Sequence, residues 1–365
     1  LKPVSRSHFN DGNRVCCHVL ESFQRNYSKL LYTRRSLIQH RANQTAADWP
    51  VIFAKTPASH AGRNLGAYRY LLATLQLTKD LQMTIEQTPN QGPLSDLRLI
   101  EMGTLLAGPF CGQLMGDFGA EVIKVEAPSK GDPMRDWGQE KQHGMSLWWP
   151  VIGRNKKSVT LNLRVKGGQE LAKKLISKAD FLLENFRPGT LERWNLSYEE
   201  LRTINPRLIM IRVSGFGQTG PYSKRAGFGA VGESMGGLRY VCGDPSTPPS
   251  RMGISIGDSL AATFACIGAL TALHHRERTG EGQVVDSAIY EAVLNMMESL
   301  ITEYDQAGYI RERHGAILPN VAPSNTYPTK DDSMILIAAN QDTVFGRLAE
   351  AMGQPELTKD KRYAT

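Results

Sequence analysis

One acidic residue lies where a reactive group would be useful. Asp258, in the segment GISIGDSLAATF, directly precedes a long apolar run that is rich in small residues and predicts a helix. This position is typical of a helix N-cap, where a carboxylate accepts from backbone N–H groups and is favoured by the helix dipole. A carboxylate anchored beside the permissive Gly257 can also be presented to an electrophile, as covalent catalysis by aspartate requires. The residues alone leave both interpretations open.

Basic side chains recur near the ends of the expected strands and in the loops behind them. They are Lys156, Lys157, Arg164, Arg187, Arg193, Lys224 and Arg225. In open α/β sheets ligands bind beyond the carboxyl ends of the strands, and arginine suits phosphate because its donors form a fixed fork. Together the residues favour a phosphorylated ligand, whereas each one taken alone could equally be a solvated surface charge.

Two other kinds of site are disfavoured by the local pattern. GFGQTG (215–220) has the spacing GxGxxG, but a dinucleotide site needs a helix that begins inside the glycines, and here Pro221 follows. We expect these glycines to allow a sharp turn or a close approach to a ligand. The five cysteines include no CxxC and no metal-ligand spacing with histidine, which predicts neither a metal site nor a disulfide framework and indicates a reducing compartment. Cys111 and Cys266 are expected to be buried as small apolar residues.

The elements that must position these residues alternate regularly from residue 93 onward. Strands are expected over 97–103, 120–128, 157–163, 180–186 and 207–214, and helices over 109–119, 167–179 and 197–206, with a polar loop over 129–144. This alternation predicts right-handed crossovers and a Rossmann-like, mostly parallel sheet. Helices over 259–275 and 287–308 follow, and then a strand over 333–340 and a helix over 343–353. We therefore expect a basic N-terminal extension (1–92), a large domain (93–310) and the beginning of a smaller domain (311–365) that is cut short.

The charge distribution argues against nucleic acid as a partner. Residues 1–92 hold 12 of the 43 Lys and Arg and 5 of the 36 Asp and Glu, so the remaining residues hold 31 of each sign. The net charge of +7 therefore lies outside the expected fold. The composition of residues 1–92, rich in Arg and Ser, is typical of a mitochondrial transit segment. A cytoplasmic location is the alternative. No uninterrupted apolar run reaches the length of a membrane span, which predicts a soluble protein without a membrane partner.

Several long segments stand out, among them LIEMGTLLAGPFCGQLMGDFGAEVIKVEAP, ENFRPGTLERWNLSYEEL and GISIGDSLAATFACIGALTALHH. In order and spacing they resemble the class III CoA-transferases, which include formyl-CoA, carnitine and succinyl-CoA:glutarate CoA-transferases and are related to the α-methylacyl-CoA racemases. The resemblance covers residues 93–365. It implies an interlocked homodimer, no permanently bound cofactor, and coenzyme A and acyl-CoA as substrates together with a carboxylic acid.

The resemblance also implies roles for individual residues. Asp258 matches the family's nucleophile, which attacks an acyl-CoA thioester to form a mixed anhydride and then an aspartyl-CoA thioester. The positions of the CoA contacts correspond here to Leu106, Ala107, Leu161, Arg164, Asn185, Phe186, Arg187, Arg193 and Arg225. Ala127 replaces an arginine of formyl-CoA transferase, and the glycine-rich loop of that enzyme is replaced by GAILPNVAPSN, so oxalate and formate specificity is not expected.

One difference from the related racemases distinguishes CoA transfer from racemisation. The racemases pair this aspartate with a histidine, because moving a proton between two faces needs both an acid and a base. The matching segment here is GFGAVG, with Phe228 at the place of the histidine. The sequence therefore predicts a CoA-transferase, with succinyl-CoA as a candidate donor. The alternatives are an acyl-CoA racemase or epimerase and a CoA-binding protein without turnover.

Overall fold

The computed structural model describes residues 56–57 and 92–363, and its largest element is a sheet of six parallel strands in the order β6-β3-β2-β7-β8-β9. The strands are β2 (Arg98–Glu101), β3 (Glu121–Glu126), β6 (Lys156–Thr160), β7 (Phe181–Glu184), β8 (Ile209–Ser214) and β9 (Val284–Ala288). In chain order they lie 3-2-1-4-5-6, which is the doubly wound Rossmann order, with the switch point between β2 and β7. The α/β fold class expected from the sequence is confirmed.

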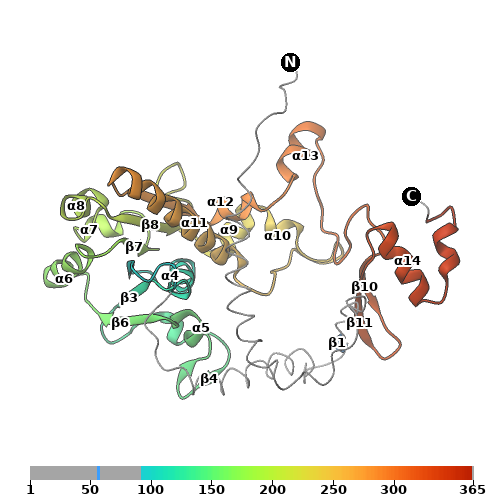
Figure 1. The fold of residues 1–365 in the computed structure, drawn as a ribbon, viewed down its shortest axis with the longest axis horizontal. Coiled ribbons are helices and arrows are strands. Elements are labelled where there is room, and N and C mark those ends of the chain that lie inside the picture. The colour runs from blue at the N-terminus through green and yellow to red at the C-terminus, as the bar shows by residue number, and fades with distance from the viewer. Residues whose placement is uncertain (1–55, 58–91, 364–365) are drawn as a thin grey trace. The chain divides into compact units, whose positions relative to one another are not determined.

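Helices cover both faces of this sheet (Figure 1). One face packs on α4 (Ala107–Asp117), α11 (Ile256–Thr279) and α12 (Ile289–Asn295), with Phe181, Leu183 and Ile211 from the strands buried beneath them. The opposite face buries Leu182 and Met210 against α6 (Lys166–Ile176), α7 (Thr190–Arg193) and α8 (Tyr198–Ile204). The central strands are apolar on both faces because both are covered, as parallel sheets require.

Helix α11 carries the segment that begins at Asp258. Its alanines are fully buried against α4 and the sheet, and their small side chains allow the helices to approach closely: Ala261, Ala262, Ala265, Ala269 and Ala272. Cys266 of α11 and Cys111 of α4 are buried at the same interface, as predicted. By length and composition alone α11 is long and apolar enough to cross a membrane, although its apolar run is interrupted at His274, His275 and Arg276. The core helix of a soluble protein meets the same criteria.

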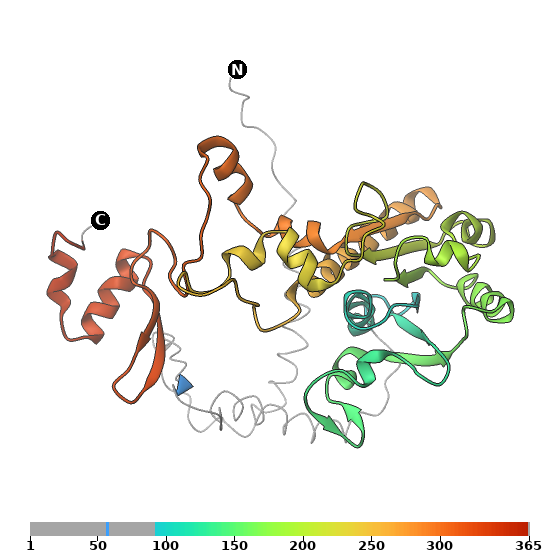
Figure 2. The ribbon, with the colours of Figure 1, turned by 180° about the vertical axis from the view of Figure 1, so that it is seen from behind.

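The segment expected as one helix over 287–308 is instead three elements. Strand β9 extends the sheet at the β8 edge, α12 follows it directly, and α13 (Leu300–Ala307) begins after a break. The strand was missed because VVDSA is short and runs straight into a helical pattern. Helices α9 (Gly229–Met235) and α10 (Leu238–Val241) were not placed in the sequence either; α9 packs on α11 and α12 (yellow and orange in Figure 2).

Smaller elements lie in the polar loop, for which the sequence predicted no structure, and near the C-terminus, where the strand expected over 333–340 and the helix expected over 343–353 are confirmed. The polar loop at 129–144 contains the 3-10 turn η1 (Pro133–Arg135) and β4 (Lys141–Gln142), which pairs with β5 (Met145–Ser146) before α5 (Trp149–Gly153). Near the C-terminus, β10 (Ser324–Pro328) pairs antiparallel with β11 (Ser333–Ala338), which also pairs with β1 (Thr56–Pro57). Helix α14 (Asp342–Ala351) and η2 (Pro355–Lys359) follow.

The expected N-terminal extension, with its transit-like composition, lies outside the described residues except for residues 56–57 and 92. The boundary between a large domain (93–310) and a small one (311–365) stays a prediction. Backbone and side-chain hydrogen bonds do join the two ranges, since Gly315 N–H donates to the Gly243 carbonyl and Tyr240 Oη donates to Glu312.

Candidate active site

A cavity of about 540 Å³, the main cavity, lies beyond the carboxyl ends of three neighbouring strands. Its walls come from the loops that follow β2 (104–107), β7 (185–188) and β8 (214–216), together with α9 and the beginning of α11. The cavity thus includes the β2/β7 switch point, where doubly wound sheets bind ligands. Asp258 is part of its lining.

Asp258 is not the N-cap of α11, so the capping interpretation is wrong. The helix begins at Ile256 after Ser255, which places Asp258 in the first turn, and the Ser255 side chain forms no capping hydrogen bond. One backbone N–H group at this end, which has no partner within the helix, is bound by a side chain of another helix. Glu233 Oε1 of α9 accepts from the Gly257 N–H at 3.2 Å. The carboxylate of Asp258 is therefore not committed to holding the helix end.

The surroundings of Asp258 are close-packed and short of positive partners. A Cβ atom on Gly229, at the first position of α9, would lie 2.5 Å from its Oδ2 atom, so any larger residue there would have to displace the carboxylate. Burial raises the pKa of Asp258 to about 6, and the negative charge of Glu233 adds to the rise, while Arg251 opposes it. Among the residues from 92 to 363, no side chain forms an ion pair with Asp258. A carboxylate with a raised pKa is a stronger nucleophile when it is ionised.

Glu233 is fixed by a second contact on its other oxygen. Its Oε2 atom accepts from Arg239 Nε at 2.6 Å, and the carboxylate is almost fully buried. The glycines of GAVGESMGG make this close packing possible, because a Cβ atom on Gly232 would lie 2.5 Å from Ile289 of α12. In the sequence, the only sign of this helix contact is the spacing of these glycines, three and four residues apart.

The opposite wall is formed by a strained loop after β2. Leu105 has a φ of 63°, an unusual conformation for a bulky residue. The loop is held on both sides: Asn185 accepts from the Thr104 N–H at 2.8 Å and donates to its carbonyl at 2.9 Å, and Asp132 accepts from the Leu105 N–H at 3.0 Å. Asn185 was predicted as a CoA contact, and its amide here positions the loop that lines the cavity.

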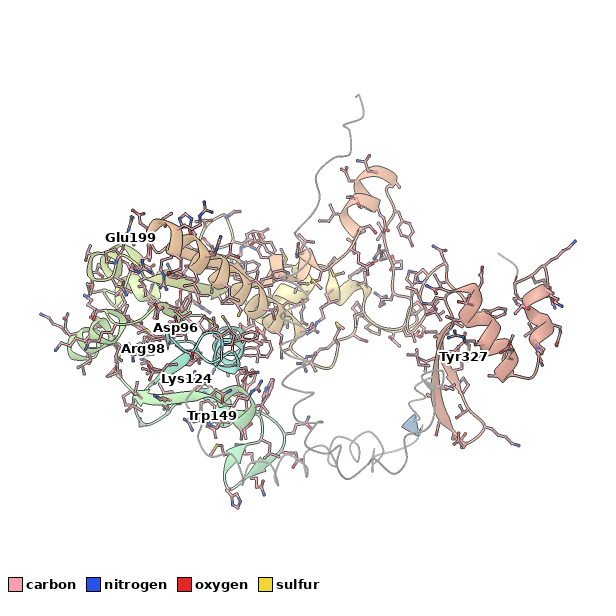
Figure 3. All side chains as sticks on the ribbon, in the orientation of Figure 1. Asp96, Arg98, Lys124, Trp149, Glu199 and Tyr327 are labelled. Carbon is pink, nitrogen blue, oxygen red and sulfur yellow. The ribbon has the colours of Figure 1, made fainter. Side chains whose placement is uncertain are left out.

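A group of buried charged side chains contacts this loop. Lys124, which belongs to the group, is labelled in Figure 3. Lys124 Nζ lies 2.7 Å from Glu101 and 2.8 Å from Asp132, and it donates to the Gly103 carbonyl. Lys156 Nζ lies 2.7 Å from the other Glu101 oxygen. Lys156 was proposed from the sequence as a phosphate-binding side chain; it is buried at the beginning of β6 and paired with Glu101, so that interpretation is wrong.

Most of the predicted CoA-contact residues line one of two cavities. Those in the main cavity are Leu106, Ala107, Asn185, Phe186, Arg187 and Arg225. A second cavity of about 150 Å³ is lined by Leu161, Arg164 and Phe186, and it shares Thr104 and Phe186 with the first. Arg193 lines neither of them, and its Nη2 atom donates to Thr190 Oγ1.

Two arginines of the main cavity, Arg239 and Arg251, were not found from the sequence. Both lie in the Gly- and Pro-rich stretch between β8 and α11, where no regular pattern indicated which side chains would meet. The guanidinium of Arg225, which was predicted, lies 4.1 Å from the centre of the Tyr222 ring. The main cavity therefore contains four arginines against two acids, which favours an anionic ligand.

The arrangement also limits the other chemistries. No histidine is among the residues that line the main cavity, and Phe228, at the N-cap of α9, is exposed in its wall. Between residues 92 and 363 no group of His, Cys, Asp and Glu side chains could hold a metal ion. The GFGQTG loop begins no helix; Gly217 and Gly220 adopt φ angles of 81° and 84°, as expected for sharp turns.

Comparison with known proteins identifies the family. The family described as CoA-transferase family III matches residues 94–365. A succinyl-CoA–D-citramalate CoA-transferase of Chloroflexus aurantiacus is 66% identical over 273 residues, which cover 75% of this chain and 68% of that protein. A succinate–glutarate CoA-transferase of Agrobacterium fabrum is 36% identical over 76% of this chain and 71% of its own length.

The fold has a solved counterpart of the same family. A crystal structure of a CAIB/BAIF family protein from Brucella suis superimposes with a TM-score of 0.68 at 37% identity, covering 75% of this chain and 73% of that one. The chain thus spans about two thirds to three quarters of the length of these proteins. Sequence and fold agree with the resemblance found in the motifs: the chain belongs to CoA-transferase family III.

Proposed function

We propose that this protein transfers CoA from an acyl-CoA, with succinyl-CoA as the first candidate, to a free carboxylic acid through covalent catalysis by Asp258. The observation that carries the proposal is the Asp258 carboxylate itself. It lines a cavity at the switch-point edge of a Rossmann-like sheet and is free of any capping role. The names of the relatives support succinyl-CoA as donor.

The proposed reaction begins on the thioester. An Asp258 oxygen attacks the acyl carbonyl, the C–S bond breaks and CoA leaves as a thiolate, which gives an acyl-aspartyl anhydride. The thiolate then attacks the Asp258 carbonyl, which releases the donor acid and forms an aspartyl-CoA thioester. The acceptor carboxylate attacks this thioester, which frees the thiolate again and forms a second anhydride between Asp258 and the acceptor. The thiolate then attacks the acceptor carbonyl of this anhydride, which yields the new acyl-CoA and restores the Asp258 carboxylate.

Each anhydride must be protected from water, because hydrolysis would end the exchange. The close contact between Gly229 and the Asp258 carboxylate supports such protection on one side. The adjoining second cavity, with Arg164 in its wall, extends the space available to a long substrate such as CoA. Arg187 and Arg225 are the candidate partners of its phosphates.

The test is the variant Asp258→Asn, which replaces the nucleophilic carboxylate by an amide of the same shape. The parent protein should transfer CoA from succinyl-CoA to a panel of carboxylic acids, and the variant should lose at least about 1,000-fold in kcat. Intact-mass measurement after mixing with succinyl-CoA should show a covalent CoA adduct on the parent alone.

Asp286→Asn is the matched control. Asp286 is another aspartate with a raised pKa, it lies outside the main cavity, and an asparagine oxygen can still accept from the Gln218 N–H. Transfer by Asp258→Asn at the rate of the control would contradict the proposal. Exchange of an α-proton in heavy water without CoA transfer would indicate a racemase, and CoA binding without either reaction would indicate a binding protein.

We also infer that the protein acts as a homodimer, as the family resemblance implies. Large apolar side chains are exposed on the elements around α9, α12 and α13: Phe228, Met235, Ile254, Met296, Ile301 and Tyr304. Exposed apolar side chains of this number favour a protein partner. Light scattering on the purified protein should give twice the chain mass, and a monomer active in CoA transfer would contradict the inference.

A further inference from the structure

The main cavity contains one cation that neither the proposed chemistry nor the expected CoA contacts require. Four arginines line it: Arg187, Arg225, Arg239 and Arg251. Arg239 is neutralised by Glu233, at 2.6 Å between Nε and Oε2. Arg187 and Arg225 occupy positions that the family resemblance gives to CoA. Arg251 is left without an assigned role.

Arg251 is held close to the reactive carboxylate by the chain segment that leads into α11. It lies seven residues before Asp258, and its Nη2 atom donates to Ser255 Oγ at 3.0 Å. Ser255 is the N-cap residue of α11, yet its hydroxyl accepts from Arg251 and forms no hydrogen bond to the helix end. This contact lies at the surface, where Arg251 is exposed, and it places the guanidinium at the beginning of the helix whose first turn carries Asp258.

The charge of Arg251 is uncompensated in the structure. No acidic side chain of the described residues forms an ion pair with it, whereas Arg239 of the same cavity has one. The electrostatic influence of Arg251 on the pKa of Asp258 agrees with their placement in one cavity. A guanidinium without an acidic partner is a ready site for a ligand carboxylate, because its parallel N–H groups match the two carboxylate oxygens.

We propose that Arg251 binds the second carboxylate of a dicarboxylic substrate while the first carboxylate, or the thioester made from it, reacts at Asp258. This inference rests on the proposed function and specifies its substrate class. A dicarboxylic substrate keeps one negative charge on its distal carboxylate throughout the exchange. That charge would be repelled by ionised Asp258, and Arg251 offsets the repulsion. A monocarboxylic substrate of the same length gains nothing from this contact.

The test compares two donors that differ mainly in the distal carboxylate, succinyl-CoA and butyryl-CoA, each with the same monocarboxylic acceptor. The parent should prefer succinyl-CoA in kcat/KM. Arg251→Gln should lower kcat/KM for succinyl-CoA by about 10- to 100-fold, the range expected for a lost hydrogen bond to a charged group, and change the value for butyryl-CoA by less than about threefold. Arg251→Lys, which keeps the charge without the fork of donors, should give an intermediate preference.

The control is Arg347→Gln, an exposed arginine of α14 that is outside the main cavity; it should leave the donor preference unchanged. Melting curves of all variants establish that they fold. An equal loss with both donors, or an unchanged preference in Arg251→Gln, would overturn the role of Arg251 and leave the proposed function in place. A parent protein that transfers CoA from neither donor to any acid would overturn both the proposed function and the role of Arg251. The absence of a covalent CoA adduct would then show that Asp258 does not act as the nucleophile.

Discussion

Glu233 of α9 caps helix α11 from outside, because its Oε1 atom accepts from the Gly257 N–H at 3.2 Å, one residue before Asp258. Two acidic residues, Glu233 and Asp258, therefore have different roles at this end of α11. Glu233 satisfies the backbone and is itself held by Arg239, whereas Asp258 is left to line the cavity. A carboxylate that held the helix end would be less available as a nucleophile, since its lone pairs would be engaged.

This division predicts that Asp258→Asn is at least as stable as the parent at neutral pH. The pKa of Asp258 rises from 3.8 to about 6 on folding, so the folded state binds its proton more tightly than the unfolded state. The parent should therefore lose stability relative to the variant as pH rises from about 4 to about 6, by about 1 to 3 kcal/mol in total, and the difference should stay constant above that range.

Thermal melting of both proteins between pH 4 and pH 8 checks this. Asp286→Asn serves as the comparison for the loss of an aspartate away from the main cavity. A variant less stable than the parent at pH 7 would show that Asp258 holds the helix after all.

The same pKa predicts the pH dependence of catalysis. Only ionised Asp258 can attack the thioester, so kcat/KM should rise with pH around a midpoint near 6. Glu233→Gln removes a negative charge that raises this pKa and retains an oxygen that can accept from Gly257. The midpoint should therefore move to lower pH. Rate profiles from pH 4.5 to 8 measure it, and a midpoint that stays fixed or rises would contradict the influence of Glu233.

Much of the fold could be predicted from the sequence because the sheet is built from local patterns. The strands that became β2, β3, β7 and β8 are short apolar runs separated by helical patterns, and that alternation leads directly to a parallel sheet. Strand β9 could not be found in this way, because its identity depends on pairing with β8 some seventy residues earlier.

The site was only partly predictable for a related reason. Asp258 could be singled out because a helix begins beside it, and the CoA contacts came from the family resemblance. Glu233, Arg239 and Arg251 act through contacts between α9, the loop that follows it and α11. The glycines of α9 signal close helix packing, but nothing in the local sequence indicates which of these side chains meet. Capping by a side chain of another helix leaves no pattern in the local sequence. The sequence therefore suggested Asp258, the nearest acid in the chain, as the N-cap.

The contact between Gly229 and Asp258 predicts a position where the smallest possible side chain reduces activity. In Gly229→Ala the new methyl group would lie 2.5 Å from Asp258 Oδ2 and must displace the carboxylate. We expect kcat to fall by about 10- to 100-fold, since small displacements of a reacting group have effects of this size. Gly167→Ala is the matched control: Gly167 lies in α6 with no atom within 4 Å of the added methyl group, and alanine favours a helix. Equal activity of the two variants would contradict the proposed position of the carboxylate.

Two consecutive lysines of β6 allow a test of the buried charges beneath the cavity wall. Lys156 is buried with its Nζ 2.7 Å from Glu101, whereas Lys157 is largely exposed and pairs with Glu121 at the surface. Lys156→Met would leave one oxygen of the fully buried Glu101 without its cation, which should lower the free energy of unfolding by about 3 kcal/mol or more. Lys157→Met should change it by less than about 1 kcal/mol, because exposed ion pairs contribute little. Denaturant unfolding of both variants measures the difference; similar effects would show that the buried charges do not hold this end of the sheet together.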